Sequence, residues 1–91
     1  MNKSELVSAM AEKTNLSKKD AELALKACMD TIQEALENGD KVQLVGFGTF
    51  ETRKRAAREG RNPRTKEVLS IPESTVPAFK PGKEFKERVN K

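Results

Sequence analysis

The hydrophobic pattern of this chain changes its period once, at Asn38-Gly39, and this change limits the possible folds more than any other feature. Before it, apolar residues recur every three or four positions, as on one face of a helix. From Lys41 onward they alternate with polar residues, as in a strand. The Asn-Gly pair is typical of the end of a helix, where the chain adopts a left-handed backbone conformation. The sequence therefore predicts an α+β fold in which helices precede strands.

Two helix starts lie before this boundary. Asn2 is followed by Glu5, and Ser17 by Asp20, at the spacing of a capping box. The apolar stripes that follow are Leu6, Val7, Met10 and Ala11 in the first helix, and Ala21, Leu25, Cys28, Ile32, Ala35 and Leu36 in the second. We expect the first helix to run to about Lys13 and the second to end at Asn38-Gly39, which gives a helical hairpin over residues 1–38.

The remainder predicts an antiparallel sheet over residues 41–79 and a short terminal helix over 82–90. Val42 and Leu44 point inward, and Gly46-Phe47-Gly48 turns the chain. The next extended segments are 49–58 and 64–71. Ile71, Val76, Ala78 and Phe79 return the chain to the core, and Phe85 with Val89 indicates the final helix.

The segment at about 53–70 is predicted to be an arm. Its middle has lost the alternating apolar residues, and a two-stranded ribbon without an apolar face cannot pack on its own body. Residues 53–66 hold seven cations and one acid, whereas the remaining 11 cations and 13 acids leave a net charge of −2. One projecting segment therefore carries the positive charge, as expected for contact with a polyanion.

The size of the chain predicts a dimer. Its 91 residues suit a single domain over 1–91, but removing the arm leaves about 70 for the body, with four Phe and no Trp or Tyr. A core this small predicts an intertwined homodimer, whose two arms would form a clamp. The predicted dimer-core residues are Ile32, Leu36, Leu44, Phe47, Phe50 and Phe79, together with Phe85.

The tip of the arm, Gly60-Arg61-Asn62-Pro63, suggests how the clamp works. Proline is common in turns for conformational reasons alone. Here, however, a rigid apolar ring stands between Arg61 and Arg64. That arrangement suits a wedge between base steps, with guanidinium groups holding the walls of the minor groove. We therefore predict contact with double-stranded DNA and intercalation by Pro63.

Several other classes of function are excluded. The chain has no His and one Cys, and no Ser stands in a recognisable nucleophile motif, so we expect no enzyme, metal site, cofactor or small-molecule substrate. Cys28 lies on the apolar stripe of the second helix, which predicts a small buried hydrophobe. No apolar run is long enough for a membrane span or a signal peptide, which predicts a cytoplasmic protein without a membrane partner.

The motifs together resemble the HU and integration host factor family of bacterial histone-like DNA-bending proteins, over all 91 residues. The matching segments are Met1-Asn2-Lys3, Leu16-Ser17-Lys18-Lys19, the run from Gly39 to Phe50, Arg55-Ala56-Ala57-Arg58, Gly60-Arg61-Asn62-Pro63 and the run from Val76 to Lys83. The resemblance implies a homodimer on the bacterial nucleoid, with a helical base, a three-stranded saddle and paired arms whose tip prolines intercalate. It also implies binding that depends little on sequence.

The resemblance further implies individual roles. Arg53, Arg55, Arg58 and Arg61 match the family's arm cations, Asn62 and Pro63 its tip, and Lys3, Lys80, Lys83 and Lys86 its phosphate-facing body positions. The charge of the arm adds Lys54, Arg64 and Lys66, while Lys18 and Lys19 are secondary candidates. The chain has Arg64, Lys66 and Thr75 where the family usually has Gln, Gly and Lys.

The predicted function is non-sequence-specific binding and bending of DNA. Because bending costs about 1 to 10 kcal/mol, bent, nicked, gapped or mismatched DNA should bind better than a straight duplex. Two alternatives stay open: a sequence-specific subunit like those of integration host factor, and a basic module that binds RNA.

Overall fold

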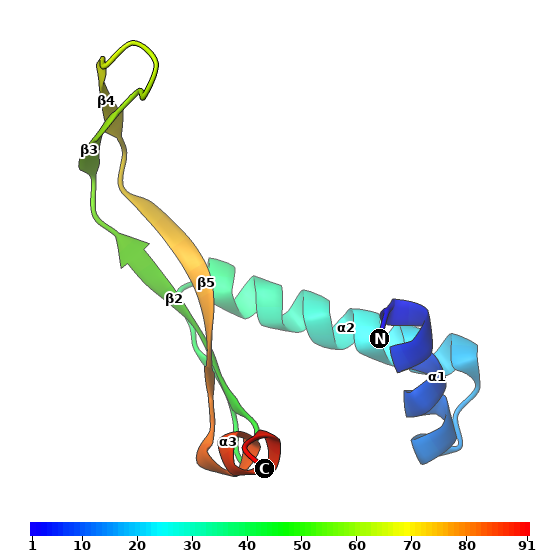
Figure 1. Cartoon of the computed structure of the whole chain (residues 1–91). Coiled ribbons are helices and arrows are strands. Elements are labelled where there is room, and N and C mark those ends of the chain that lie inside the picture. Colours follow the sequence, from blue (N-terminus) through cyan, green and yellow to red (C-terminus); the bar gives the residue numbers. More distant parts are fainter. The chain divides into compact units, whose positions relative to one another are not determined.

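The computed structural model describes all 91 residues and has the predicted α+β architecture (Figure 1). It divides into two compact units, Met1–Ala35 and Leu36–Lys91, and each is described by itself. That they function as one domain stays a prediction. The elements are α1 (Lys3–Thr14), α2 (Lys18–Glu37), β1 (Val42–Leu44), β2 (Gly48–Arg55), β3 (Arg58–Arg61), β4 (Val68–Ile71), β5 (Ser74–Pro81) and α3 (Lys83–Val89).

Both predicted helix starts are confirmed by side-chain hydrogen bonds. The Glu5 N–H donates to Asn2 Oδ1 at 2.9 Å, and the Asp20 N–H donates to Ser17 Oγ at 3.1 Å. Each bond satisfies one amide that the first turn of a helix leaves without a partner. Gly39, with φ of 81°, follows the end of α2 in the left-handed region, as predicted.

The first unit has a very small core. Val7, Ala11 and Ala21 are its buried apolar residues, and Met10 and Leu25 pack against them in part. Because Ala21 is the one buried residue of α2, most of the apolar stripe on that helix stays accessible in the single chain. Cys28, predicted to be buried, is exposed. That prediction is wrong for the single chain, because no apolar group covers this part of the stripe.

In the second unit β1, β2 and β5 form an antiparallel sheet in that order, and β3 pairs with β4 in a separate two-stranded ribbon (Figure 1). The pairing offset of β3 with β4 is the same as that of β2 with β5. The ribbon is therefore the continuation of one long hairpin. It is interrupted only at residues 56–57 and 72–73, where Pro72 has no N–H to donate to the ladder.

Two details of the predicted arm need correction. Its strands were expected over 49–58 and 64–71, but residues 62–67 form the turn at the tip, so the descending strand begins only at Val68. The ribbon is also not free of apolar side chains, since Val68, Leu69 and Ile71 on β4 are 59%, 47% and 37% exposed. These three residues form an apolar run on the descending strand, which pairs with the charged ascending strand.

The four phenylalanines of the second unit form one cluster, with Phe50 and Phe79 on the sheet, Phe47 in the turn between β1 and β2, and Phe85 on α3. The ring centroids of Phe50 and Phe79 lie 4.8 Å apart, and those of Phe47 and Phe85 5.1 Å apart. The Gly82 N–H donates to the Phe47 carbonyl at 2.9 Å, which fixes the start of α3 beside the turn between β1 and β2. The cluster is nevertheless open, because Phe47 is 44% and Phe79 36% exposed.

Candidate nucleic-acid interface

The two faces of the three-stranded sheet differ in chemistry. Directly paired residues share a face, and residues two apart on one strand share it too. Phe50 pairs with Phe79, which defines the apolar face. The opposite face carries Arg53 and Arg55 on β2 and, through its pairing with Thr49, Lys80 on β5. Three of the predicted DNA-contacting cations therefore lie on one surface.

Lys54 is separated from this group. It alternates with Arg53 and Arg55 along β2 and pairs with Thr75, so it points to the face of the sheet that carries Phe50. Its ammonium nitrogen lies 3.8 Å from Glu73 Oε1, and both side chains are well exposed. The structure thus does not bring Lys54 together with the two neighbouring arginines.

The ribbon carries cations on both of its faces. Arg58 pairs with Ile71, and Arg61 pairs with Val68, so the two arginines, three residues apart, point in opposite directions. Both are exposed. An element with cations on both faces can engage both walls of a groove that it enters.

The tip is an ordered turn. The Lys66 N–H donates to the Asn62 carbonyl at 2.8 Å, and the Asn62 N–H donates to the Glu67 carbonyl at 3.0 Å. The Asn62 side chain accepts a further bond from the Arg64 N–H at 2.9 Å. Pro63 is exposed within this turn, and Asn62, the residue before it, is half-buried. The proline ring is therefore accessible on a backbone that these hydrogen bonds hold.

Lys66 closes this turn with an unusual backbone. Its φ is 59°, in the left-handed region that glycine adopts easily and that other L residues adopt at a cost. The position where the family usually has glycine is therefore one where the turn requires a left-handed residue. This chain gains a cation there and accepts the strain.

The remaining predicted cations lie outside the sheet and ribbon. Lys3 begins α1 and pairs with Glu22, with its ammonium nitrogen 3.5 Å from Glu22 Oε1. Lys83 and Lys86 are three apart on α3, which places them on one side of that helix, and both are exposed.

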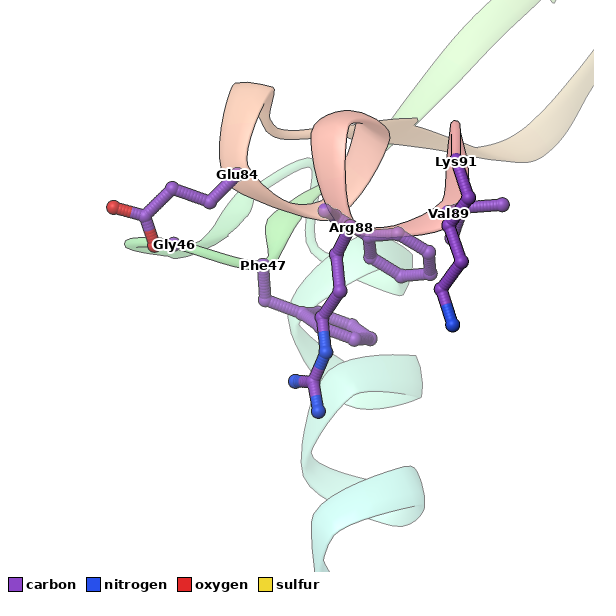
Figure 2. Close-up of a pocket in the computed structure, with 7 residues that line it drawn as sticks. Gly46, Phe47, Glu84, Arg88, Val89 and Lys91 are labelled. Carbon is purple, nitrogen blue, oxygen red and sulfur yellow. The ribbon is translucent and has the colours of Figure 1, made fainter.

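An apolar groove of about 600 Å³ runs beside α3 and the turn between β1 and β2 (Figure 2). Phe47, Phe85 and Val89 supply apolar lining, and Arg88 and Lys91 add charged groups. No cluster of three or more His, Cys, Asp or Glu side chains is arranged to hold a metal ion. None of the helices combines the length and the apolar character needed to cross a membrane.

Comparison with known proteins gives a consistent result. The model of the family described as "Bacterial DNA-binding protein" matches residues 1–90. The DNA-binding protein HU of Clostridium pasteurianum is 74% identical over 91 residues, which is all of both chains. The HU of Geobacillus stearothermophilus is 63% identical over 89 residues, covering 98% of this chain and 99% of that protein.

Solved structures agree with the sequence matches. The cocrystal structure of Anabaena HU with DNA superposes with a TM-score of 0.93 at 58% identity, covering 98% of this chain and 97% of that one. HU from Thermotoga maritima gives a TM-score of 0.70 at 42% identity, with 98% of each chain covered. The predicted arrangement of helices, three-stranded sheet, arm and terminal helix is therefore confirmed.

Proposed function

Since this chain belongs to the bacterial DNA-binding protein family, we propose that it binds double-stranded DNA with little sequence preference and bends it, as an architectural protein of the HU type. The observation that carries this proposal is the cationic surface that begins on the polar face of the sheet and continues along the ribbon to the tip. Proteins of this family are not enzymes, so the prediction of no catalysis is confirmed.

The ribbon is the element proposed to enter the minor groove. Its two strands are narrow, and its arginines point to both sides, so the guanidinium groups can reach acceptors and phosphates along both walls. At its end Pro63 stands exposed on an ordered turn, as a wedge between base pairs requires. Insertion there would unstack one base step and kink the duplex.

The proposed DNA-contacting residues have three locations. The sheet provides the polar-face cations, the arm provides the groove contacts, and the helices provide outlying lysines that would meet phosphates of a bent duplex. They are Arg53, Arg55 and Lys80 on the sheet; Arg58, Arg61, Asn62, Pro63, Arg64 and Lys66 on the arm; and Lys3, Lys83 and Lys86 on the helices. Lys54, which faces the other side of the sheet, contributes only to the general positive field.

A homodimer is proposed from the exposed apolar surface. Phe47, Phe79 and Leu44 are 36% to 44% exposed in the single chain, although aromatic clusters of this kind usually form a core. A second copy would cover this cluster and the groove beside α3. Two copies related by a twofold axis would present two ribbons, as a clamp on DNA needs.

The cellular partner follows from these features. An abundant polyanion that can be bent is the ligand that suits two projecting cationic arms, and bacterial chromosomal DNA is such a ligand. We therefore place the protein on the nucleoid in the cytoplasm. No membrane or small-molecule ligand has a role in this proposal.

One substitution tests the intercalation of Pro63 separately from the attraction of the cations to phosphates. Pro63→Ala should reduce the bend of a duplex labelled for energy transfer at both ends, and it should reduce the preference for nicked over intact DNA. The salt dependence should stay near that of the wild type, because no cation is removed. If the protein contacts about six to ten phosphates, raising the salt from about 50 to 200 mM would lower the affinity by about 10³- to 10⁵-fold. An unchanged bend would exclude Pro63 from the mechanism.

The partner is tested by competition. Several unrelated duplexes of equal length should bind with similar affinity, and structured RNA should compete less well than nicked duplex DNA. One duplex bound far more tightly than the others would favour a sequence-specific role. Equal competition by RNA would favour the RNA-binding alternative.

A further inference from the structure

One carboxylate on the polar face of the sheet holds two cations. Glu51 Oε2 lies 3.7 Å from the Lys41 ammonium nitrogen, and Glu51 Oε1 lies 3.7 Å from Arg53 Nη2. The Glu51 side chain is only 19% exposed, whereas those of Lys41 and Arg53 are 71% and 63% exposed. The acid is thus set into the surface with a cation on each of its two oxygens.

The register of the sheet explains this arrangement. Glu51 and Arg53 are two apart on β2 and share the polar face. Val42 pairs with Phe50, so Lys41, one residue before β1, stands opposite Glu51 across the strand pair. The partner of Glu51 on β5 is Ala78, a small side chain that leaves room for the carboxylate. Lys41 therefore lies on the same face as Arg53, Arg55 and Lys80.

The grouping of Lys41, Glu51 and Arg53 has a physical consequence for binding a polyanion. Two cations this close would repel each other and spread apart if no acid lay between them. Free Lys and Arg side chains also lose much rotamer entropy when they are fixed on a ligand. A half-buried carboxylate opposes both effects because it holds the two cationic groups near one point before the ligand arrives.

We propose that Lys41 is a further phosphate-contacting residue and that Glu51 is the positioning residue that holds Lys41 and Arg53 as one phosphate site on the sheet. This inference rests on the proposed function, since the ligand is the DNA backbone. A phosphate accepts hydrogen bonds from both cations at once, and Glu51 stays beneath them. Lys41 was not among the cations predicted from the sequence, because its local context there is simply the outward side of a strand.

The simple alternative gives the opposite sign. An acid on a surface that binds DNA should repel phosphates, so that its neutralisation strengthens binding. Glu59 provides the matched control, because it lies on the ribbon, is exposed and forms no ion pair. Glu51→Gln and Glu59→Gln both raise the net charge by one, and they differ in whether cations lose their anchor.

The experiment measures the affinity of the full-length chain for an intact duplex over a salt series, with wild type, Glu51→Gln, Glu59→Gln, Lys41→Gln and the double variant Lys41→Gln/Glu51→Gln. We expect Glu51→Gln to bind at least about threefold more weakly, and Glu59→Gln to bind as well as wild type or better. Lys41→Gln should reduce the magnitude of the slope of log affinity against log salt by about 0.9, the value for one phosphate. The double variant should bind no more weakly than Glu51→Gln alone.

Three results would overturn the proposal. They are tighter binding by Glu51→Gln to the same degree as Glu59→Gln, an unchanged salt slope in Lys41→Gln, and single effects that multiply in the double variant. Urea denaturation of each variant shows that the fold is kept, and Lys41→Gln tests the contact even if Glu51→Gln unfolds. Failure of the wild type to bind any duplex would instead reject the proposed function, and this inference with it.

Discussion

Lys66→Gly should stabilise the turn at the tip of the arm, although it removes a cation. The backbone of residue 66 has φ of 59°, and the left-handed region costs a residue with a Cβ about 1–2 kcal/mol. Glycine adopts this conformation easily, so Lys66→Gly removes that cost. Glycine also gains more conformational freedom when the turn opens, and this entropy cancels about 0.4–1 kcal/mol of the stabilisation. The net gain is then about 0.5–1 kcal/mol, or roughly a two- to fivefold shift toward the closed turn.

Amide hydrogen exchange at Asn62 is a suitable measurement. Its N–H donates to the Glu67 carbonyl at 3.0 Å, so it exchanges only when the turn opens. The substitution does not change the residues on either side of that amide, so its intrinsic exchange rate is unaffected. Protection of Asn62 should rise about two- to fivefold in Lys66→Gly.

Lys66→Ala is the matched control, because it loses the same charge and keeps a Cβ at the left-handed position. Its Asn62 protection should equal that of wild type or fall below it. The two variants should also differ in bending, with the glycine variant bending DNA more, since it presents Pro63 on the better-formed turn. Equal protection in the two variants would show that the turn stores no strain at residue 66 and would refute the reasoning.

Two further substitutions test the sheet. Gly48→Ala should lower the free energy of unfolding by about 1–3 kcal/mol in urea denaturation, because a Cβ there would lie 2.6 Å from Phe79 Cζ and 2.7 Å from the Lys80 carbonyl oxygen. Gly39→Ala is the control, because its Cβ would meet no atom within 4 Å and the substitution should cost only about 1 kcal/mol for the left-handed backbone. Arg55→Gln should lower the salt slope of DNA binding by about 0.9, whereas Lys54→Gln, on the opposite face, should leave it nearly unchanged, and equal slopes would contradict the assignment of faces.

The helical hairpin could be predicted closely because its signals are local. A side-chain cap needs only residues three apart, and the hydrogen bonds from Glu5 to Asn2 and from Asp20 to Ser17 are found as expected. The left-handed residue after α2 is likewise a property of Asn38-Gly39 itself. The motif signals used for the family were similarly local, and the family they indicated is confirmed.

The faces of the sheet were harder to predict because they depend on the register between strands. The run from Arg53 to Arg55 is a single basic cluster in the sequence, yet strand alternation sends Lys54 to the opposite face. The ion pair between Lys41 and Glu51 joins residues ten positions apart and exists only once β1 and β2 are aligned. No pattern within one segment could have found it.

The burial of the apolar residues was predicted from their spacing, and spacing does not state which chain covers them. The stripe on α2 has helical periodicity, but Ala21 is its one buried residue in the single chain, and Cys28 is exposed. The phenylalanines likewise form a cluster that remains open at Phe47 and Phe79. An amphipathic pattern thus identifies a face that requires cover, and for this chain the cover is proposed to be a second copy.

The placement of the apolar residues and of the cations in this chain connects assembly with DNA binding. The chain uses its apolar residues on surfaces that it cannot cover alone. Its cations Arg53, Arg55 and Lys80 lie on the sheet face opposite the phenylalanines, and the ribbon carries further cations on both of its faces. A single ribbon could supply a wedge at one base step, but two wedges at a fixed separation require the twofold pair. In the proposed dimer, assembly would therefore contribute to bending in addition to stability, because it would set the distance between the two proposed kinks. The length of duplex bent between them should depend on the dimer interface, while the attraction to phosphates depends on the cations.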